Sequence, residues 1–357
     1  MIKSIHIRNF KSIKDSGEVL LRPINVLIGA NGVGKSNFIG FFKFLNKIYN
    51  KELQLYVAQN GRADNFLFFG SKFSSSLSGT ITFDNKYQNE YSFKLIPDQT
   101  GNFIFAEEWS NTKTGDLLIN EIGDRESEIK NHSWFRSGYL SDQLSTLKIF
   151  HFHDTSFNAK VKQPSITQDY AYLHEDGGNL ASFLYRLQEN NPTNFDFIEN
   201  IIRSIAPFFD SFYLKPDEIN PQQIYLRWRE KGFEQLFTAH NLSDGTLRMI
   251  CLITLLLQPK PPKTIIIDEP ELGLHPFAIT KLAGLLHNVP DTTQIILSTQ
   301  SVNLVNEFNA QDIVVVEREN NGETIFKRQS EEELVNWLKH YSIGELWEKN
   351  VLGGRPQ

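Results

Sequence analysis

This sequence of 357 residues has a single cysteine, lacks long apolar runs and has only a small excess of negative charge. The single cysteine, Cys251, excludes an internal disulfide framework and fits a reducing cytosol. It lies in the apolar run 249–257, which at nine residues is too short to span a bilayer. The first residues lack the apolar segment of a signal peptide. We therefore expect a cytoplasmic protein that does not enter a membrane.

The charge balance also excludes a general nucleic-acid binder. The net charge is −6, so any contact with DNA must come from a local basic patch. The sequence contains two small basic clusters: the first is Lys3, Arg8, Lys11 and Lys14, and the second is Arg227, Arg229 and Lys231. Solvated strand faces explain these clusters as well as contact with DNA does. No long heptad run is present, which excludes an extended coiled coil. His151 and His153 lie close in sequence, but no cysteine or carboxylate cluster accompanies them, so we predict no metal site there.

The pattern that organises the chain is G-x-x-x-x-G-K-S at residues 29–36. A predicted buried strand, residues 24–28, precedes it, and apolar residues at helical spacing follow it. This context favours phosphate binding over the alternative of a glycine-rich turn with a chance Lys-Ser. Glycines let successive N–H groups point inward, and the helix N-terminus adds about half a positive charge. The predicted nucleotide-binding residues are Asn31, Gly32, Gly34, Lys35, Ser36 and Asn37.

A second motif, residues 264–270, is an apolar strand that ends in two carboxylates. We predict that Asp268 orients Mg²⁺ together with the Ser36 hydroxyl, and that Glu269 is the general base that polarises the attacking water. Lys35 contacts the β- and γ-phosphates in this interpretation. A solvated turn at the strand end is the alternative for the two acids. With the upstream glycine-rich loop, they predict Mg²⁺-dependent ATP hydrolysis.

Periodicity and turn residues predict the remaining elements. Short strands are expected at residues 2–8, 17–21, 80–83, 91–95, 148–152, 264–267 and 294–297. Helices are expected at residues 179–188, 195–206, 246–257, 276–289 and 302–308, with a last one from about 331 and a frayed tail at 352–354. Turns are expected at 14–17, 84–85, 97–98 and 113–115, and hairpins at 224–238 and 312–328.

Residues 241–248, which read N-L-S-D-G-T-L-R, precede the apolar helix and the strand that carries Asp268. They resemble the signature motif of ABC-type ATPases, in the branch that includes the RecF, SMC and OLD families. Residues 7–12 and 271–276 resemble the first strand and the D-loop of that branch. The resemblance covers most of residues 1–310, and it is closest to the compact OLD/RecF-like ATPases of bacterial antiphage and DNA-maintenance systems.

The resemblance implies an α/β P-loop ATPase head of the ABC type. Such a head has a mixed or parallel core sheet, an antiparallel β lobe and a short helical insertion. We expect the head at residues 1–310, with a β-rich insertion at about 64–150 and a helical insertion at about 175–215. Residues 311–357 then form a C-terminal hairpin and helix extension.

The resemblance also implies that Ser243 and Gly245 act on ATP bound by a second subunit. The result would be a head-to-tail homodimer or a higher even oligomer, closed by ATP. A hydroxyl, an unobstructed N–H and a helix N-terminus suit this role. An ordinary helix N-cap at Ser243 or Asp244 is the alternative.

Two departures from the family pattern matter. The signature reads Ser-Asp-Gly where many ABC proteins have Ser-Gly-Gly, and Gln300 stands where many relatives carry histidine. A neutral amide can donate to the γ-phosphate, so Gln300 joins Lys35 and Glu269 as a predicted catalytic residue. A plain polar residue at a helix entrance is the alternative for Gln300. The family's glutamine near Mg²⁺ has no assigned position, and the loop after Phe152 is the best region for it.

The sequence thus predicts an ATPase that senses or regulates on behalf of a separate effector, with a nuclease as one candidate. OLD-family proteins carry a C-terminal Toprim nuclease, and no such acidic constellation follows Gln300. The expected docking surface is the tail or the β-rich insertion, because neither is required for phosphate binding. A slow or non-hydrolysing scaffold locked by nucleotide is one alternative. A transporter nucleotide-binding domain is another, against which the opening segment and the signature variant argue.

Overall fold

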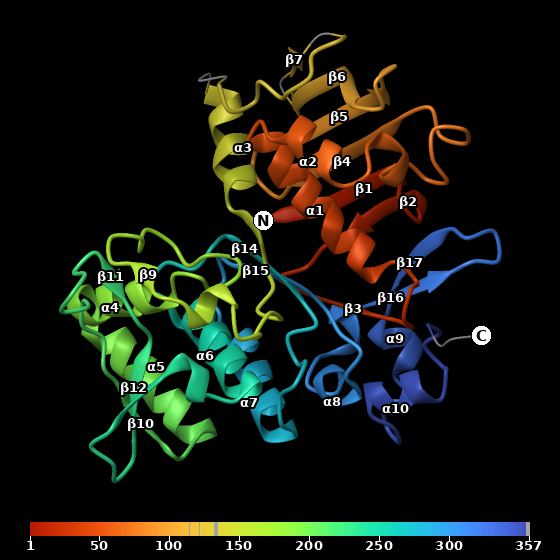
Figure 1. The fold of residues 1–357 in the computed structure, drawn as a ribbon. Coiled ribbons are helices and arrows are strands. Elements are labelled where there is room, and N and C mark those ends of the chain that lie inside the picture. The colour runs from red at the N-terminus through yellow and green to blue at the C-terminus, as the bar shows by residue number, and fades with distance from the viewer. Residues whose placement is uncertain (114, 121, 132–134, 355–357) are drawn as a thin grey trace. The chain divides into compact units, whose positions relative to one another are not determined.

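The computed structural model describes residues 1–113, 115–120, 122–131 and 135–354, without the side chains of 135–137. Thr114, in one of the predicted turns, and the last three residues of the chain lie outside this description. The chain divides into two compact units (Figure 1). The first comprises Met1–Ile149, Pro262–Asp268 and Asp291–Gln357, and the second comprises Phe150–Pro261 and Glu269–Pro290.

The core of the first unit is a mixed six-stranded sheet of order β17-β16-β3-β15-β14-β8. Strand β3 is parallel to β15 and β16, β14 is parallel to β15, and β17 is antiparallel to β16. The parallel strands are apolar and buried along nearly their whole length, as expected for a covered parallel sheet. The strands are β3 (Ile24–Ile28), β8 (Leu147–Phe150), β14 (Thr264–Asp268), β15 (Gln294–Ser298), β16 (Ile313–Arg318) and β17 (Thr324–Arg328).

The second sheet of this unit is antiparallel, with order β2-β1-β4-β5-β6-β7. Its strands are β1 (Ile2–Phe10), β2 (Ile13–Leu20), β4 (Leu77–Phe83), β5 (Glu90–Pro97), β6 (Phe103–Thr112) and β7 (Gly115–Asn120). Buried and partly buried residues alternate along β4, as expected when one face of a sheet packs against the core. The N-terminal strands therefore share a sheet with the β-rich segment that the sequence assigned to an insertion, whereas β8 joins the core sheet.

The predicted turn at residues 14–17 is wrong. Strand β2 begins at Ile13, so the chain reverses at Lys11 and Ser12. Lys11 has a φ of 52°, in the left-handed region, which allows this tight reversal. Gly17, with a φ of 58°, lies inside β2, where the pairing with β1 shifts register. This glycine therefore accommodates a β-bulge and not a turn.

Helix α1 (Lys35–Tyr49) packs on both sheets of the first unit. Its Phe41 ring lies 5.2 Å from Phe10 of β1 and 6.1 Å from Phe93 of β5. Residues Ile266 and Ile296 of the core sheet belong to the same buried cluster. Helix α2 (Leu53–Gln59) and helix α3 (Phe135–Ser145) contact β6 of the antiparallel sheet. The abundant phenylalanines are thus concentrated around α1, where they join the two sheets.

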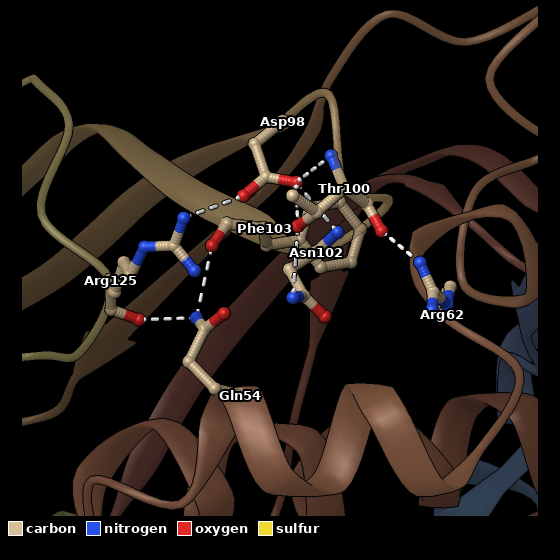
Figure 2. A network of polar contacts seen from close by, with 7 residues as sticks. All are labelled: Gln54, Arg62, Asp98, Thr100, Asn102, Phe103 and Arg125. Carbon is tan, nitrogen blue, oxygen red and sulfur yellow. Dashed lines mark hydrogen bonds and ion pairs between the residues drawn. The ribbon is translucent and has the colours of Figure 1, made fainter.

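Figure 2 shows how the turn between β5 and β6 is held. Asp98 Oδ1 accepts hydrogen bonds from the backbone N–H groups of Thr100 and Asn102, and Asp98 Oδ2 lies 3.0 Å from Arg125. Gln54 of α2 donates to the carbonyl of Phe103 at 3.0 Å. The predicted turn at 97–98 is confirmed, and side-chain acceptors from one aspartate stabilise it.

The second unit is mainly helical, with helices α4 (Leu180–Asn190), α5 (Pro192–Ile205), α6 (Asp244–Leu257) and α7 (Pro276–His287). Helix α6 contacts both α5 and α7, and most of its residues are buried, as its apolar sequence predicted. A three-stranded sheet joins β10 (Phe209–Phe212), β12 (Arg227–Glu230) and β13 (Leu236–Thr238), and a short ladder joins β9 (Ser165–Ile166) to β11 (Gln223–Ile224). The predicted hairpin at 224–238 is therefore shorter than expected, because Ile224 pairs with Ser165.

The C-terminal residues include α8 (Val302–Val305), α9 (Glu331–Leu334) and α10 (Ile343–Glu348). Two expectations about this region need correction. The hairpin of β16 and β17 is an integral part of the core sheet, because β16 pairs directly with β3. Residues 352–354 are not frayed: Leu352 and Gly354 are buried, and the Gly354 N–H donates to Glu317 Oε1 at 2.9 Å. Among the described residues, no helix has the length and apolar character needed to cross a bilayer.

Candidate nucleotide-binding site

The glycine-rich loop connects the carboxyl end of β3 to the first residue of α1, Lys35. Gly29, Gly32 and Gly34 have φ values of 153°, 78° and 116°, which favour glycine. Gly34 is the N-cap of α1, and neither a side-chain cap nor an acidic residue is present in the first turn. The positive end of this helix is therefore uncompensated by side chains, which is the arrangement that attracts a phosphate.

The predicted binding side chains surround this loop. Lys35 is 5% exposed, and its Nζ donates to the carbonyls of Gly29 at 2.6 Å and Ala30 at 3.0 Å. Ser36, in contrast, is exposed at the start of the helix. Asn37 Nδ2 donates to Ser12 Oγ at 2.7 Å, which joins the reversal between β1 and β2 to the first turn of α1. The lysine thus already lies across the loop that would hold the phosphates.

Asp268 lies at the same edge of the core sheet as the glycine-rich loop. The strand registers align Asp268 with Ser298 and Ser298 with Leu27, across β14, β15 and β3. Because neighbouring strands lie about 4.8 Å apart, β14 and β3 are separated by roughly 10 Å. Ser298 Oγ bonds to Asp268 Oδ1, which fixes one carboxylate oxygen. The sequence analysis did not identify Ser298 as part of this site.

Gln300 follows β15 at this edge and is exposed. The backbone N–H of Thr299 donates to the carbonyl of Leu27 at 3.0 Å, so the chain leaves β15 beside the end of β3. Ser301 is the N-cap of α8, and its Oγ accepts from the N–H of Leu304. Gln300 therefore directly precedes the N-cap of α8, which is Ser301.

Glu269 directly follows Asp268 and has an unusual backbone conformation, with a φ of 45°. A non-glycine residue in the left-handed region costs conformational energy, and such strain is concentrated at functional sites. The carbonyl of Glu269 accepts the N–H of Leu272, which closes the turn at the start of residues 269–274. Glu269 belongs to the second unit, together with the signature residues.

In the second unit, Ser243 is the N-cap of α6, and its Oγ accepts from the N–H of Thr246 at 3.2 Å. The capping role considered for Ser243 is therefore present, and the residue is also exposed. Gly245 lies against the D-loop: a Cβ at this position would be 2.4 Å from the carbonyl oxygen of Gly273. The signature thus requires a glycine here because the D-loop backbone approaches so closely.

Arg248 is a structural residue of this region that the sequence analysis missed. Its guanidinium donates to three backbone carbonyls, those of Phe152, His153 and Leu272. One side chain therefore connects helix α6 with the D-loop and with the loop after Phe152, the region in which the unassigned glutamine was expected. An arginine at a signature helix could have drawn attention, because its five donors suit several acceptors at once.

Lys11, at the reversal between β1 and β2, is a half-buried cation. Its Nζ lies 5.6 Å from the ring centroid of Phe10 and 5.8 Å from that of Phe66. Burial lowers the pKa of Lys11, and the charge of nearby Lys43 lowers it further.

No group of three or more histidine, cysteine, aspartate or glutamate residues within the described ranges could hold a metal ion. A Mg²⁺ ion bound with nucleotide needs only one or two protein oxygens.

Three comparisons with known proteins bear on this site. Residues 24–306 match the family described as "AAA domain, putative AbiEii toxin, Type IV TA system". Old nuclease of Escherichia phage P2 is 24% identical over 391 residues, covering 96% of this chain and 63% of that protein. The chain therefore spans less than two thirds of the length of this curated relative.

Two solved structures of SMC heads share the fold. One, an SMC head bound to the C-winged helix domain of ScpA, has a TM-score of 0.64 at 16% identity and covers 94% of this chain and 99% of that chain. The other, an SMC head with an extended coiled coil bound to the C-terminal domain of ScpA from Pyrococcus furiosus, has a TM-score of 0.61 at 14% identity and covers 95% and 98%. The predicted α/β head fold and the predicted resemblance are thus confirmed. The chain belongs to the AAA-domain family matched over residues 24–306, and it resembles the RecF/SMC/OLD-like branch of ABC-type P-loop ATPases.

Proposed function

We propose that this chain hydrolyses ATP with Mg²⁺, and that ATP closes two copies of it head to tail. The observation that carries the proposal is the shared edge of the core sheet. There the uncapped N-terminus of α1 and the side chain of Lys35 follow β3, and the carboxylate of Asp268 lies at the end of β14, with only the parallel strand β15 between them. Ligands of α/β sheets bind at the carboxyl ends of the strands, which supports this location.

The residues present fit both ligands. Successive positive-φ glycines and a helix N-terminus suit a polyphosphate, and the hydroxyl of Ser36 with the carboxylate of Asp268 supplies the oxygen ligands that Mg²⁺ prefers. Bound Mg²⁺ neutralises charge on the β- and γ-phosphates. Asn31, Gly32, Gly34 and Asn37 complete the proposed nucleotide contacts along the loop and the first turn of α1.

Each proposed catalytic residue has a defined task. Lys35 exchanges its loop carbonyls for β- and γ-phosphate oxygens and stabilises the charge that develops there. Glu269 accepts a proton from the attacking water as the new bond to the γ-phosphorus forms and the bond to the bridging oxygen breaks. Gln300 donates an amide hydrogen to the γ-phosphate. The strained backbone of Glu269 supports its role, because strain is retained where geometry matters.

The proposed dimer places Ser243 and Gly245 over the nucleotide of the partner subunit. The exposed hydroxyl of Ser243 and the N-terminus of α6 support this arrangement. We further propose that the closed dimer acts on a separate effector protein, with a nuclease as one candidate, in antiphage defence or DNA maintenance. The named relative, Old nuclease, motivates this class of effector.

Calorimetry and turnover together test the ATPase proposal. We expect Lys35→Ala to weaken Mg-ATP binding at least 100-fold and Glu269→Gln to bind ATP normally while losing 10²–10⁴-fold in turnover, since the amide cannot accept the proton. Lys94→Ala is the matched control for Lys35, because Lys94 is an exposed lysine of the antiparallel sheet in a long ion pair with Glu107. Unchanged affinity in Lys35→Ala would rule out the site. A wild-type chain that binds Mg-ATP but does not turn it over, with binding weakened in Lys35→Ala, would favour the nucleotide-locked scaffold.

A mixing experiment tests the head-to-tail arrangement. Ser243→Asp keeps a good N-cap for α6 and adds a carboxylate that repels a phosphate. Neither Lys35→Ala nor Ser243→Asp should hydrolyse ATP alone, whereas their mixture should regain part of the activity through one intact composite site. Absence of recovery, although native mass spectrometry shows the mixed dimer, contradicts the assignment of Ser243 to the partner's nucleotide.

A further inference from the structure

We infer that Thr324, on the C-terminal strand β17, is a positioning residue for the phosphate-binding loop. Thr324 lies 291 positions after Val33, yet its Oγ1 donates to the carbonyl of Val33 at 2.7 Å. The side chain is 1% exposed. This inference rests on the proposed function only in that the loop binds a nucleotide.

The need for this hydroxyl follows from the geometry of the loop. When successive N–H groups of a glycine-rich loop point toward a ligand, the carbonyls point outward and require other donors. Lys35 serves the carbonyls of Gly29 and Ala30, and Thr324 serves that of Val33. A buried carbonyl without a donor is costly, so the orientation of the peptide between Val33 and Gly34 depends on Thr324.

Thr324 is also bonded to the reversal between β1 and β2. Its Oγ1 lies 2.8 Å from Ser12 Oγ, its backbone N–H donates to the carbonyl of Ser12 at 2.9 Å, and Ser12 Oγ accepts from Asn37. Thr324 therefore joins the loop, the reversal between β1 and β2, and the first turn of α1. A Cβ added to Gly34 would lie 2.3 Å from Thr324 Oγ1, which shows how closely β17 approaches the loop.

The last described residues support the base of the same loop. Gly354 has a φ of 80°, and a Cβ there would lie 3.4 Å from Gly29 Cα. The Gly354 N–H donates to Glu317 Oε1, and Glu317 also pairs with Lys327 of β17 at 2.7 Å. Strands β16 and β17 with residues 353–354 thus form a brace around the loop. We refer to these elements as the C-terminal brace.

We expect the C-terminal brace to affect the affinity for nucleotide more than it affects the turnover rate. Thr324→Val keeps the shape of the side chain and removes the hydroxyl, whereas Thr324→Ser keeps the hydroxyl. We expect Thr324→Val to raise the Kd for Mg-ATP and for Mg-ADP about tenfold, the effect of losing one hydrogen bond to a buried carbonyl. Its kcat should stay within about threefold of wild type, and Thr324→Ser should restore affinity.

Thr254→Val is the matched control. Thr254 is fully buried in α6 of the second unit, and its Oγ1 donates to the carbonyl of Ile250 at 2.8 Å. It should lose a similar amount of thermal stability with no change in Kd. The inference is overturned if Thr324→Val binds both nucleotides as tightly as wild type, or if Thr254→Val weakens binding equally. A wild-type chain that does not bind ATP would instead contradict the proposed function.

A second variant keeps the inference testable if Thr324→Val does not fold. Ser12→Ala removes only the hydroxyl that bonds to Thr324 and Asn37. We expect a smaller but measurable increase in Kd, about threefold, with an unchanged melting temperature, because Ser12 is only half-buried. Wild-type affinity in a folded Ser12→Ala protein would overturn the inference by itself.

Discussion

The two six-stranded sheets of the first unit use polar residues in opposite ways. The central parallel strands of the core sheet are mostly apolar, and Asp268, Ser298 and the glycine-rich loop lie in register at their carboxyl ends. The antiparallel sheet instead buries a carboxyl group in its interior. Glu108 of β6 is 0% exposed, and its Oε1 accepts from Tyr91 at 2.6 Å and Ser127 at 2.5 Å. The proposed chemistry therefore belongs to one sheet, and a purely structural polar cluster belongs to the other.

Strand geometry explains this difference. Parallel strands end together, so side chains after several strands meet at one edge without interrupting the buried ladder. In the antiparallel sheet, β6 shifts its pairing with β5 after Lys94 and its pairing with β7 after Glu108. The first irregularity, in the pairing with β5, moves the inward face of β6 from odd to even positions, from Phe105 to Glu108. Strict alternation along β6 would leave Glu108 exposed, and the bulge instead points its side chain into the core.

The largest effect on activity should come from the edge of the core sheet. Asp268→Asn removes the charge that is proposed to orient Mg²⁺ and should lower ATP turnover about 100-fold or more, with normal folding. Asp98→Asn makes the same change in the antiparallel sheet, where Asp98 holds a turn (Figure 2). It should leave turnover unchanged. Turnover is measured at saturating Mg-ATP. Equal losses in the two variants would contradict the assignment of the proposed chemistry to the core sheet alone.

The largest effect on stability should come from the interior shared with α1. Phe44 is 0% exposed, and its ring lies 5.5 Å from Phe66 and 5.6 Å from Phe10. Phe44→Ala should lower the free energy of unfolding by about 3–5 kcal/mol through loss of burial and the resulting cavity. Below its melting temperature, the variant should still bind Mg-ATP with near-normal affinity. Denaturant titration and calorimetry measure the two quantities, and a loss of affinity without a loss of stability would contradict this view.

The smallest expected effect concerns Glu108 and depends on pH. Burial raises the pKa of Glu108, although the hydroxyls of Ser127 and Tyr91 act in the opposite direction. Because the folded-state pKa lies above the unfolded value, the stability that this group contributes is present below the unfolded pKa and is lost as the pH rises through the folded pKa. Glu108→Gln cannot ionise, so its stability relative to wild type should improve by about 1–3 kcal/mol between acidic and mildly alkaline pH.

Thermal melts of both proteins from pH 4.5 to 8 measure this difference. Glu107→Gln is the control, because Glu107 is an exposed neighbour on the same strand. The curves of Glu107→Gln and wild type should stay parallel across this range. If the stability of Glu108→Gln relative to wild type does not change with pH, Glu108 is not protonated in the folded state and the antiparallel sheet holds a buried charge.

The sequence predicted the core sheet well, because short apolar runs are typical of buried parallel strands and the phosphate-binding loop has a fixed pattern. It predicted α6 because nearly every residue of that helix is buried. It misplaced the reversal between β1 and β2, since a left-handed Lys11 carries no sequence signal and Gly17 serves a bulge as readily as a turn. It correctly placed Asn179 at a helix start, yet this side chain holds the loop before α4 by donating to the carbonyls of Asp169 and Tyr172.

Long-range contacts explain the features that could not be predicted from the sequence. Nothing near Thr324 in the sequence indicates that its hydroxyl meets Val33, and nothing near residues 353–354 indicates that they pack on Gly29. The sequence analysis treated the C-terminal tail as unnecessary for phosphate binding, whereas in the structure Gly354 approaches Gly29 and Thr324 bonds to Val33. Ser298 was missed for the same reason, because only the register of β14 and β15 pairs it with Asp268.

Arg248 has an electrostatic consequence beyond packing. Its three acceptors are peptide carbonyls, which bear no net charge, so the guanidinium keeps its full positive charge near the first turn of α6. The helix end contributes about half a positive charge of the same sign, and Asp244 in the first turn, which lies 3.5 Å from Lys162, offsets part of it. The side chain that ties three segments together thus also raises the local potential felt by an approaching polyanion. Salt should therefore slow the proposed encounter of this surface with a nucleotide-bearing partner more than the protein's net charge of −6 would suggest.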